Sequence, residues 1–239
     1  MGPCEPEAAC AFEELFAVET ATAAQRRAPR PRADALRNRE RIVTAARESF
    51  VEFGADVPLD EVARRAGVGN ATVYRHFADR AELVHHVLLF VTDRVTAQAD
   101  EAVEAADADP AAAFEALRRF THAAVEERIG ALCPIISEAL DPEHPDLHAA
   151  RLRLEGAVEG LMARVRDAGQ LRTDIGVGDL MVALSQLTRP LPGSSGCLMD
   201  FDRFVHRHLQ LFLDGLMAPA RSTLPGHPAT LEDLRNKAH

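Results

Sequence analysis

Five polar side chains that can donate hydrogen bonds lie close together within the segment from Gly67 to Leu83. They are Asn70, Thr72, Tyr74, Arg75 and His76. Hydroxyl, imidazole and guanidinium groups can donate to phosphate oxygens, and an Asn or Arg side chain can contact a base edge with two hydrogen bonds. The whole chain has a formal net charge of -10, so this concentration of donors and cations is local. It favours a segment that meets a polyanion, and a solvated helix face is the simpler alternative.

The charge is distributed unevenly along the chain. Residues 25–80 contain 12 Arg and 8 Asp or Glu, a net charge of +4, so the remainder of the chain carries -14. A basic N-terminal module joined to an acidic remainder indicates that only the first part binds a polyanion.

Three helices are expected to position the donors. Apolar spacing predicts a helix over residues 33–53, which Gly54 ends. Pro58 suits the first turn of a second helix, which ends at Gly67, and a third short helix covers about Asn70 to Phe77. Two short helices joined by a turn that contains glycine indicate a helix-turn-helix. The small apolar residues expected between the crossing helices are Val62, Ala63, Ala66, Val68 and Val73.

The stretch LDEVARRAGVGNATVYRHFADRAELVHHV, from Leu59 to Val87, resembles the DNA-binding signature of TetR-family bacterial regulators. The resemblance is strongest between about Arg37 and Val87. It lies in the Ala-Gly-Val turn, the Thr-Val-Tyr of the recognition helix, the His-Phe pair and a basic residue followed by Glu-Leu. Two positions depart from the family pattern. Gly69 replaces a frequent Ser, which removes a capping or phosphate-binding hydroxyl, and Arg80 replaces a usual Lys, which keeps the charge and changes its geometry.

The resemblance implies a role for each residue of this segment. The expected phosphate contacts are Thr72, Tyr74, His76 and Arg80, and the candidates for base edges are Asn70, Ala71 and Arg75. Arg37, on the first helix, is a further DNA-binding candidate. His76 has a structural alternative, in which it caps the short helix and packs against its neighbour, and Phe77 is expected in the core.

The rest of the chain is helical in pattern, and no strand pattern or internal repeat is found. The expected helices cover residues 80–106, 110–127, 130–140, 145–170, 176–188 and 200–217. The predicted fold is therefore all-α, with an N-terminal three-helix helix-turn-helix DNA-binding domain and a C-terminal helical ligand-binding and dimerisation domain. The expected boundaries are a flexible arm over 1–31, the DNA-binding domain over 32–80, the second domain over 81–218 and a flexible tail over 219–239.

The last two long helices are more apolar than a one-sided surface helix needs to be. This pattern, and the family resemblance, predict a symmetric four-helix dimer interface, with packing inside one chain as the alternative. The interface candidates are Phe201, Phe204, Val205, Phe212 and Leu216. Leu211 and Leu213 begin a second apolar stripe on the same helix.

The resemblance also implies an effector cavity between the long helices of the second domain. The candidate lining residues are Phe90, Phe114, Phe120, Met162, Met181 and Leu184, with His122 and Cys133 as polar contacts. Each of them is more often a core residue than a ligand contact. Few ionisable residues lie on these apolar faces, so we expect an apolar or aromatic effector.

Other chemistry finds little support in the sequence. His144 and His148 stand at i and i+4, but no third ligand is placed beside them, so we expect no metal site and no cofactor. We find no nucleophile elbow, phosphate loop or paired buried carboxylates, so we expect no enzyme. Four scattered Cys, an acidic start and the absence of an apolar run of about 18 residues favour a reducing, cytoplasmic location.

These observations predict a ligand-responsive transcriptional regulator that binds a palindromic operator as a homodimer. Repression is the favoured mode of action, with release from double-stranded DNA by a small apolar or aromatic effector. The alternative is a helix-turn-helix regulator without a small-molecule response, either constitutive or controlled by a protein partner.

Overall fold

The computed structural model describes residues 31–54, 56–130, 132, 144–189, 201–230 and 233, and the side chains of 31–33 and 201–203 are not described. The chain divides into two compact units, residues 1–37 and 38–239. In the first unit the description covers the beginning of α1, where Arg37 Nη1 lies 3.5 Å from Asp34 Oδ1. The second unit contains the rest of α1 and all of the other described elements.

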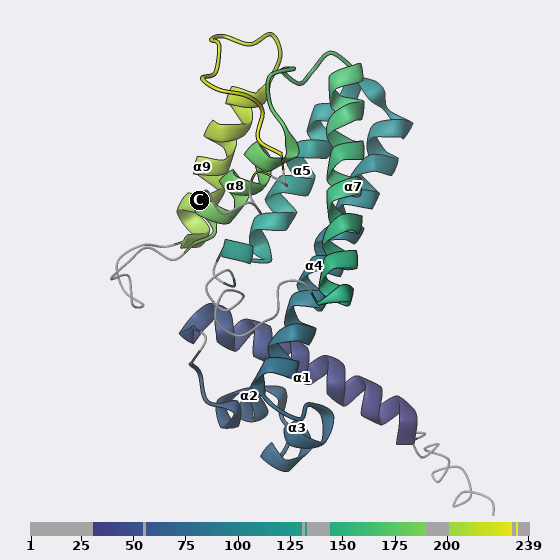
Figure 1. The fold of residues 1–239 in the computed structure, drawn as a ribbon, viewed down its shortest axis with the longest axis vertical. Helices are drawn as coiled ribbons and strands as arrows, with labels where there is room; N and C mark the ends of the chain where they lie inside the picture. The colour runs from purple at the N-terminus through teal and green to yellow at the C-terminus, as the bar shows by residue number, and fades with distance from the viewer. Residues whose placement is uncertain are drawn as a thin grey trace, which may run out of the picture. The chain divides into compact units, whose positions relative to one another are not determined.

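The described part of the chain is almost entirely helical, as the sequence predicts (Figure 1). The elements are α1 Pro31–Phe53, α2 Leu59–Ala66, α3 Asn70–His76, α4 Arg80–Ala108, the short 3-10 helix η1 Pro110–Ala112, α5 Ala113–Glu126, α7 Pro145–Asp167, α8 Val177–Leu187 and α9 Phe201–Leu216. One isolated antiparallel bridge joins Leu171 to Met217. The predicted arm over 1–31, apart from Pro31, and most of the predicted helix over 130–140 lie outside the described residues. None of the described helices is long and apolar enough to cross a membrane.

The helix ends follow from the residues that terminate them. Gly67 ends α2 with a left-handed φ of 64°, and its amide donates to the carbonyls of the preceding turn. A Cβ at this position would lie 2.8 Å from Arg41 Nη2, the mobile end of a long side chain, so it is the left-handed backbone that favours glycine here. At the start of α4, Asp79 caps the helix by accepting a hydrogen bond of 2.8 Å from the backbone N–H of Glu82.

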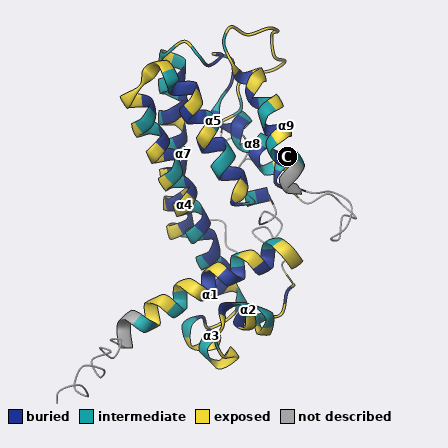
Figure 2. Ribbon diagram, turned by 180° about the vertical axis from the view of Figure 1, so that it is seen from behind, coloured by how far each residue is buried: buried dark blue, intermediate teal, exposed yellow. Residues whose placement is uncertain are grey.

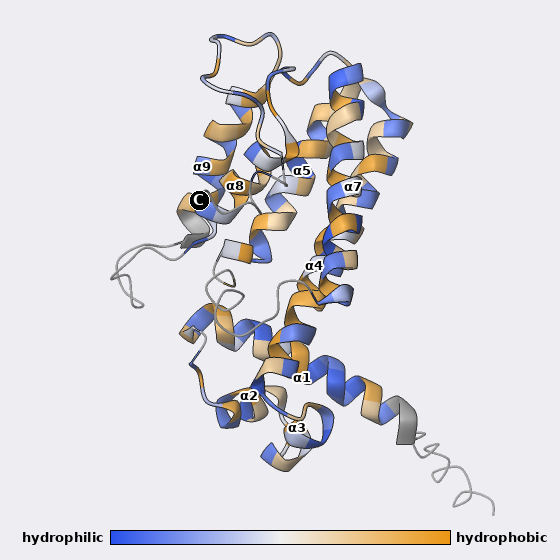
Figure 3. Cartoon of the chain, viewed as in Figure 1, coloured by the Kyte–Doolittle hydropathy of each residue, from blue (hydrophilic) through white to orange (hydrophobic). Residues whose placement is uncertain are grey.

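The long helix α4 runs from the helix-turn-helix into the second domain (Figure 1). It has 29 residues, which correspond to roughly 43 Å at 1.5 Å per residue. Its later turns pack against α5 and α7, and α5 also contacts α8 and α9. The buried apolar side chains of the second unit form one cluster that extends from Ile42 to Leu216. Figure 3 shows hydrophobic and hydrophilic residues interspersed along these helices, as expected where one side of a helix is buried.

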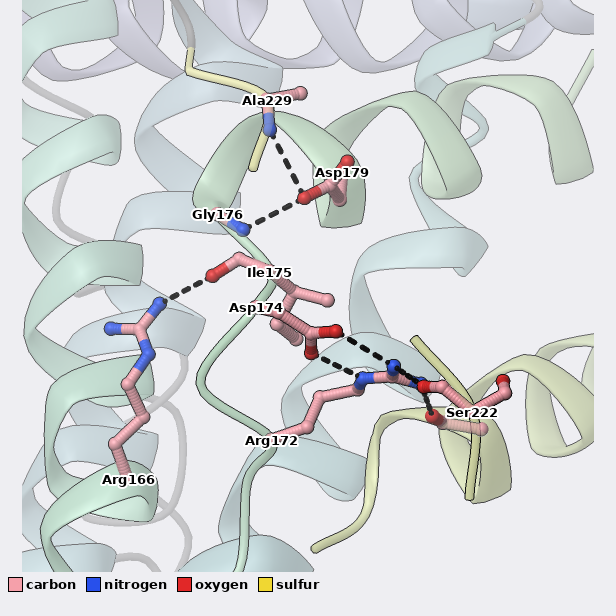
Figure 4. A network of polar contacts seen from close by, with 9 residues as sticks. Arg166, Arg172, Asp174, Ile175, Gly176, Asp179, Ser222 and Ala229 are labelled. Carbon is pink, nitrogen blue, oxygen red and sulfur yellow. Dashed lines mark hydrogen bonds and ion pairs between the residues drawn. The ribbon is translucent and has the colours of Figure 1, made fainter. Parts of the chain in front are cut away.

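A polar network fixes the segment before α8 and part of the chain after α9 (Figure 4). Arg172 Nη2 lies 2.9 Å from Asp174 Oδ2 and donates to the carbonyl of Ser222 at 2.7 Å. Asp179 Oδ2 accepts from the backbone N–H of Ala229 at 3.2 Å. The sequence predicts a flexible tail from residue 219, whereas the described tail residues make specific hydrogen bonds. The reason is that polar groups on α8 and on the segment before it are placed to receive the tail backbone.

Candidate nucleic-acid interface

The short helix α3 carries most of the predicted DNA contacts and turns them outward. Val73 is its only buried residue, with no exposed surface, and it anchors the helix in the core. The opposite side of α3 is exposed (Figure 2). Tyr74 is 53% exposed, and Asn70, Ala71 and Arg75 are also exposed. The helix therefore presents a polar face on the side opposite its one buried residue, Val73.

Two of the donors on this face already have neighbours within the module. The Asn70 side chain donates to Asp60 Oδ1 on α2, and Arg75 Nη2 donates to Thr72 Oγ1 at 3.3 Å. Asn70 must exchange its hydrogen bond if it is to contact a base. The bond of Arg75 is long and exposed, so its guanidinium is easily redirected toward DNA.

The N-terminus of α3 lacks a side-chain cap. Gly69 occupies the N-cap position, and no side chain accepts from the first turn. This confirms the consequence expected from the replacement of a family Ser by Gly69. At the other end, Phe77 is the C-cap and is only 1% exposed, so its predicted place in the core is confirmed.

Arg80 has a contact inside the protein that the sequence does not reveal. Its guanidinium donates to the carbonyl of Val57 in the segment before α2, and the residue is half-buried. This bond ties the start of α4 to the helix-turn-helix. A phosphate contact for Arg80 stays a prediction, and any substitution there will also loosen the module.

Basic residues of α1 hold the DNA-binding module together. Arg39 Nη2 lies 2.6 Å from His86 Nε2, and its guanidinium lies 5.1 Å from the centre of the Phe77 ring. Burial and the charge of Arg39 hold the pKa of His86 below its usual range, which fits a neutral imidazole that accepts from the guanidinium. Arg41 donates to the carbonyl of Ala66 at the end of α2. The sequence alone counts these arginines as available for DNA, but part of the positive charge serves internal contacts.

A buried carboxylate connects α1 with the second domain. The Glu127 side chain is 3% exposed and lies just after α5. Its Oε1 accepts from Arg94 Nε on α4 at 2.8 Å, and its Oε2 lies 3.1 Å from Arg47 Nη2 on α1. Arg47 Nε is buried without a hydrogen-bond partner among the described residues. No sequence pattern indicates this contact, because the three residues are far apart in the chain.

Comparison with known proteins identifies the family. Residues 42–87 match the bacterial regulatory proteins of the tetR family, and residues 109–218 match the C-terminal domain of SbtR-like transcriptional regulators. A solved TetR transcriptional regulator from Streptomyces coelicolor is 30% identical to this chain. The alignment covers 76% of this chain and 99% of that one, with a TM-score of 0.54. This chain belongs to the TetR family.

Two further relatives show where the likeness is local and where it concerns the fold. An HTH-type transcriptional regulator from Staphylococcus aureus is 38% identical over 58 residues, which are 24% of this chain and 31% of that relative's length. The TetR-like regulator LfrR from Mycobacterium smegmatis, solved in complex with proflavine, is 20% identical. It covers 79% of this chain and 99% of its own, with a TM-score of 0.54. The protein is thus a TetR-family transcriptional regulator with a DNA-binding domain and an all-α fold.

Most of the predicted effector contacts of this TetR-family protein lie in or beside its core. Phe114, Phe120, Met162 and Leu184 are buried, and Phe90 and Met181 are partly buried against the core. Cys133 lies outside the described residues. A cavity between α4 and α5 includes one predicted contact, Phe120.

The cavity between α4 and α5 has a volume of about 250 Å³. Phe120 and several alanines line its apolar part, and Gln98, Glu101 and Arg119 line its polar part. Gln98 Oε1 is buried without a hydrogen-bond partner among the described residues. A buried acceptor without a donor is unfavourable, so a ligand that supplies a donor would be stabilised here.

His122 contacts another helix and does not line this cavity. Its Nδ1 lies 2.7 Å from His206 Nδ1 on α9, and the two rings are stacked 5.0 Å apart. Burial first, and then the charge of His206, lower the pKa of His122. His206 Nε2 in turn lies 2.6 Å from Glu126 Oε1. The predicted polar ligand contact is therefore a link between α5 and α9.

The candidate interface residues on α9 differ in how much surface they leave exposed. Val205 and Leu216 are only 4% and 5% exposed within the single chain, so they offer little surface to a partner. Phe204 and Phe212 are partly buried, and the side chain of Phe201 is not described. The exposed apolar residue of α9 is Leu211, at 62%. The core of the same chain therefore covers Val205, Leu216 and also Leu213, which is fully buried, and it leaves Leu211 exposed.

Proposed function

We propose that this TetR-family regulator binds a palindromic operator as a homodimer and that a small effector lowers its operator affinity, so that it acts as a repressor. The observation that carries the proposal is the outward polar face of α3, with Tyr74 and Arg75 exposed and Val73 anchored in the core. A short recognition helix covers only a few base pairs. Two copies at a separation of about 34–36 Å would enter successive major grooves.

The face of α8 and α9 supports the proposed dimer. Leu211 on α9 and Val182 on α8 are 62% and 39% exposed. Both line a hollow of about 680 Å³ together with Leu224 from the tail. An exposed apolar surface of this kind favours association, and a two-fold axis through it would form a four-helix interface.

The cavity between α4 and α5 supports an effector site. It combines the Phe120 ring with the unpartnered amide oxygen of Gln98, which favours a small aromatic ligand with a hydrogen-bond donor. LfrR, a protein of the same fold, was solved with proflavine, so this fold can hold a planar aromatic molecule. Because α4 begins beside α3 and also lines this cavity, a ligand that shifts α4 would change the placement of the recognition helix.

Selection of duplexes from a random library by the full-length protein tests the DNA-binding part of the proposal. We expect a palindromic site. The Arg75→Ala variant should lose about 1–3 kcal/mol at one position of each half-site and relax the base preference there. Arg153→Ala, an exposed substitution on α7 away from α3 and from the proposed dimer face, is the matched control and should bind like the unchanged protein. Recovery of unrelated sequences without symmetry would contradict the proposal.

Titration of an effector with and without operator tests the response. Aromatic amines, proflavine among them, are first screened by the shift in melting temperature, and hits are then titrated against the protein alone and the protein–operator complex. The operator should weaken effector binding by about 5- to 150-fold, which is the usual range of allosteric coupling. Phe120→Trp should block binding by filling the cavity. Equal effector affinity in both titrations would favour the alternative, a constitutive or protein-partnered regulator.

A further inference from the structure

Three side chains that can bind a metal ion lie together where α4 meets α7. They are His85 in the second turn of α4, His144 at the N-cap of α7 and Asp146 in the first turn of α7. One ligand atom of each lies within 4.8 Å of the other two. Among the described residues, this is the only group of three or more His, Cys, Asp or Glu side chains arranged in this way.

The two rings and the carboxylate lie close together. The centres of the His85 and His144 rings lie 4.3 Å apart with an interplanar angle of 62°. His144 Nδ1 lies 4.0 Å from Asp146 Oδ2, and it accepts only a long hydrogen bond of 3.3 Å from the Asp146 backbone N–H. A nitrogen that accepts a hydrogen bond carries a lone pair, and a metal ion on Nδ1 would have to replace this long bond.

We propose that His85, His144 and Asp146 bind a divalent transition metal ion, with Zn²⁺ the preferred ion, and that water completes the coordination. Imidazole nitrogen and carboxylate oxygen are ligands that Zn²⁺ prefers. Tetrahedral bonds of about 2.0–2.2 Å place ligand atoms roughly 3.3–3.6 Å apart, so ligand atoms as much as 4.8 Å apart must approach by up to about 1.5 Å. The side chains of His144 and Asp146 are 45% and 68% exposed, which allows this rotation and gives the ion a path from solvent.

The location gives the ion a structural consequence. The positive end of the α7 dipole opposes a cation at this helix start, and the Asp146 carboxylate offsets that effect. An ion held here would link α7 to α4 at His85, five residues after the start of α4. The next residue, His86, is hydrogen-bonded to Arg39 of the DNA-binding module. The site is separate from the proposed effector cavity. It includes His85 of α4, whereas the sequence pattern drew attention only to His144 and His148.

Titration of the chelator-treated full-length protein with Co²⁺, followed by displacement with Zn²⁺, tests the site. We expect one Co²⁺ per chain, a visible absorption spectrum of nitrogen and oxygen ligands, and a higher melting temperature with Zn²⁺. Asp146→Asn and His85→Gln should each weaken binding at least about 10-fold, because even the loss of a group that only orients a ligand weakens metal sites about 10- to 100-fold. Asp146 is exposed, so its variant keeps the fold, which the melting temperature without metal verifies.

His148→Ala is the matched control, since His148 lies one turn along α7 from His144. It should bind Co²⁺ like the unchanged protein. Loss of binding in His148→Ala with retention in His85→Gln would place the ion on α7 alone and overturn the proposal. An absorption spectrum with thiolate charge-transfer bands, or no saturable binding, would also overturn it. No arm of this test uses DNA, so its outcome is independent of the proposed operator binding.

Discussion

Replacing Glu127 with glutamine should lower the free energy of unfolding by about 3 kcal/mol. The carboxylate is 3% exposed and is shared by Arg94 at 2.8 Å and Arg47 at 3.1 Å. Removing one partner of a buried ion pair costs about 3–5 kcal/mol, because a charge is left without its counterion. The Arg94 side chain is 52% exposed and can turn to water, but that of Arg47 is 20% exposed. The lower end of the range therefore applies.

Thermal and urea unfolding measure this effect, with Glu126→Gln as the matched control on the preceding residue. For a chain of this size about 3 kcal/mol corresponds to a fall in melting temperature of about 6–12 °C. The Glu126 side chain is 56% exposed and pairs with His206, so its variant should lose less than about 1 kcal/mol. The double variant that combines Glu127→Gln with Arg47→Met should lose less stability than the sum of the losses of the two single variants, because both changes remove the same contact. Equal melting temperatures for the Glu127 and Glu126 variants would refute the reasoning.

Four further outcomes follow from the described contacts. Tyr74→Phe should weaken binding to all duplexes about equally, measured by titration of operator and unrelated DNA, and a loss confined to one sequence would remove Tyr74 from the phosphate contacts. Leu211→Asp should yield monomers in sedimentation, while the control Leu152→Asp, which changes an apolar and exposed residue of α7, stays dimeric; a dimeric Leu211→Asp would place the interface elsewhere. Burial and the charge of Arg39 lower the pKa of His86 in the folded protein, so the unfolded chain takes up a proton at a higher pH than the folded chain does. The stabilising effect should therefore be fully present above about pH 6.5 and decrease below it, and His86→Gln should make the free energy of urea unfolding less dependent on pH. Gly67→Ala should cost about 1–2 kcal/mol in urea unfolding because of the left-handed φ of 64°, and an unchanged midpoint would show that the turn adapts.

The sequence predicts the helix-turn-helix well because its signals are local. Gly67 terminates α2 and Val73 marks the buried side of α3 through interactions within a few residues. The outward face of α3 then follows from helical periodicity. The same reasoning does not place α9, a helix that is apolar on two sides. Periodicity does not say which of its apolar side chains its own chain covers, and the packing of α5 and α8 against α9 buries Val205 and Leu213 but leaves Leu211 exposed.

The sequence alone therefore determined the all-α class, the DNA-binding module and the residues that face outward from α3, since each depends on neighbours in the chain. The tertiary structure alone decided which residues far apart in sequence meet: Arg39 with His86, Arg47 with Glu127, and His85 with His144. Charge and polarity mark all of these residues as candidates for solvent or ligand. Whether a charged group contacts DNA, a buried counterion or a metal depends on which helices pack together, and that packing is set by the apolar core, which the polar residues themselves do not encode.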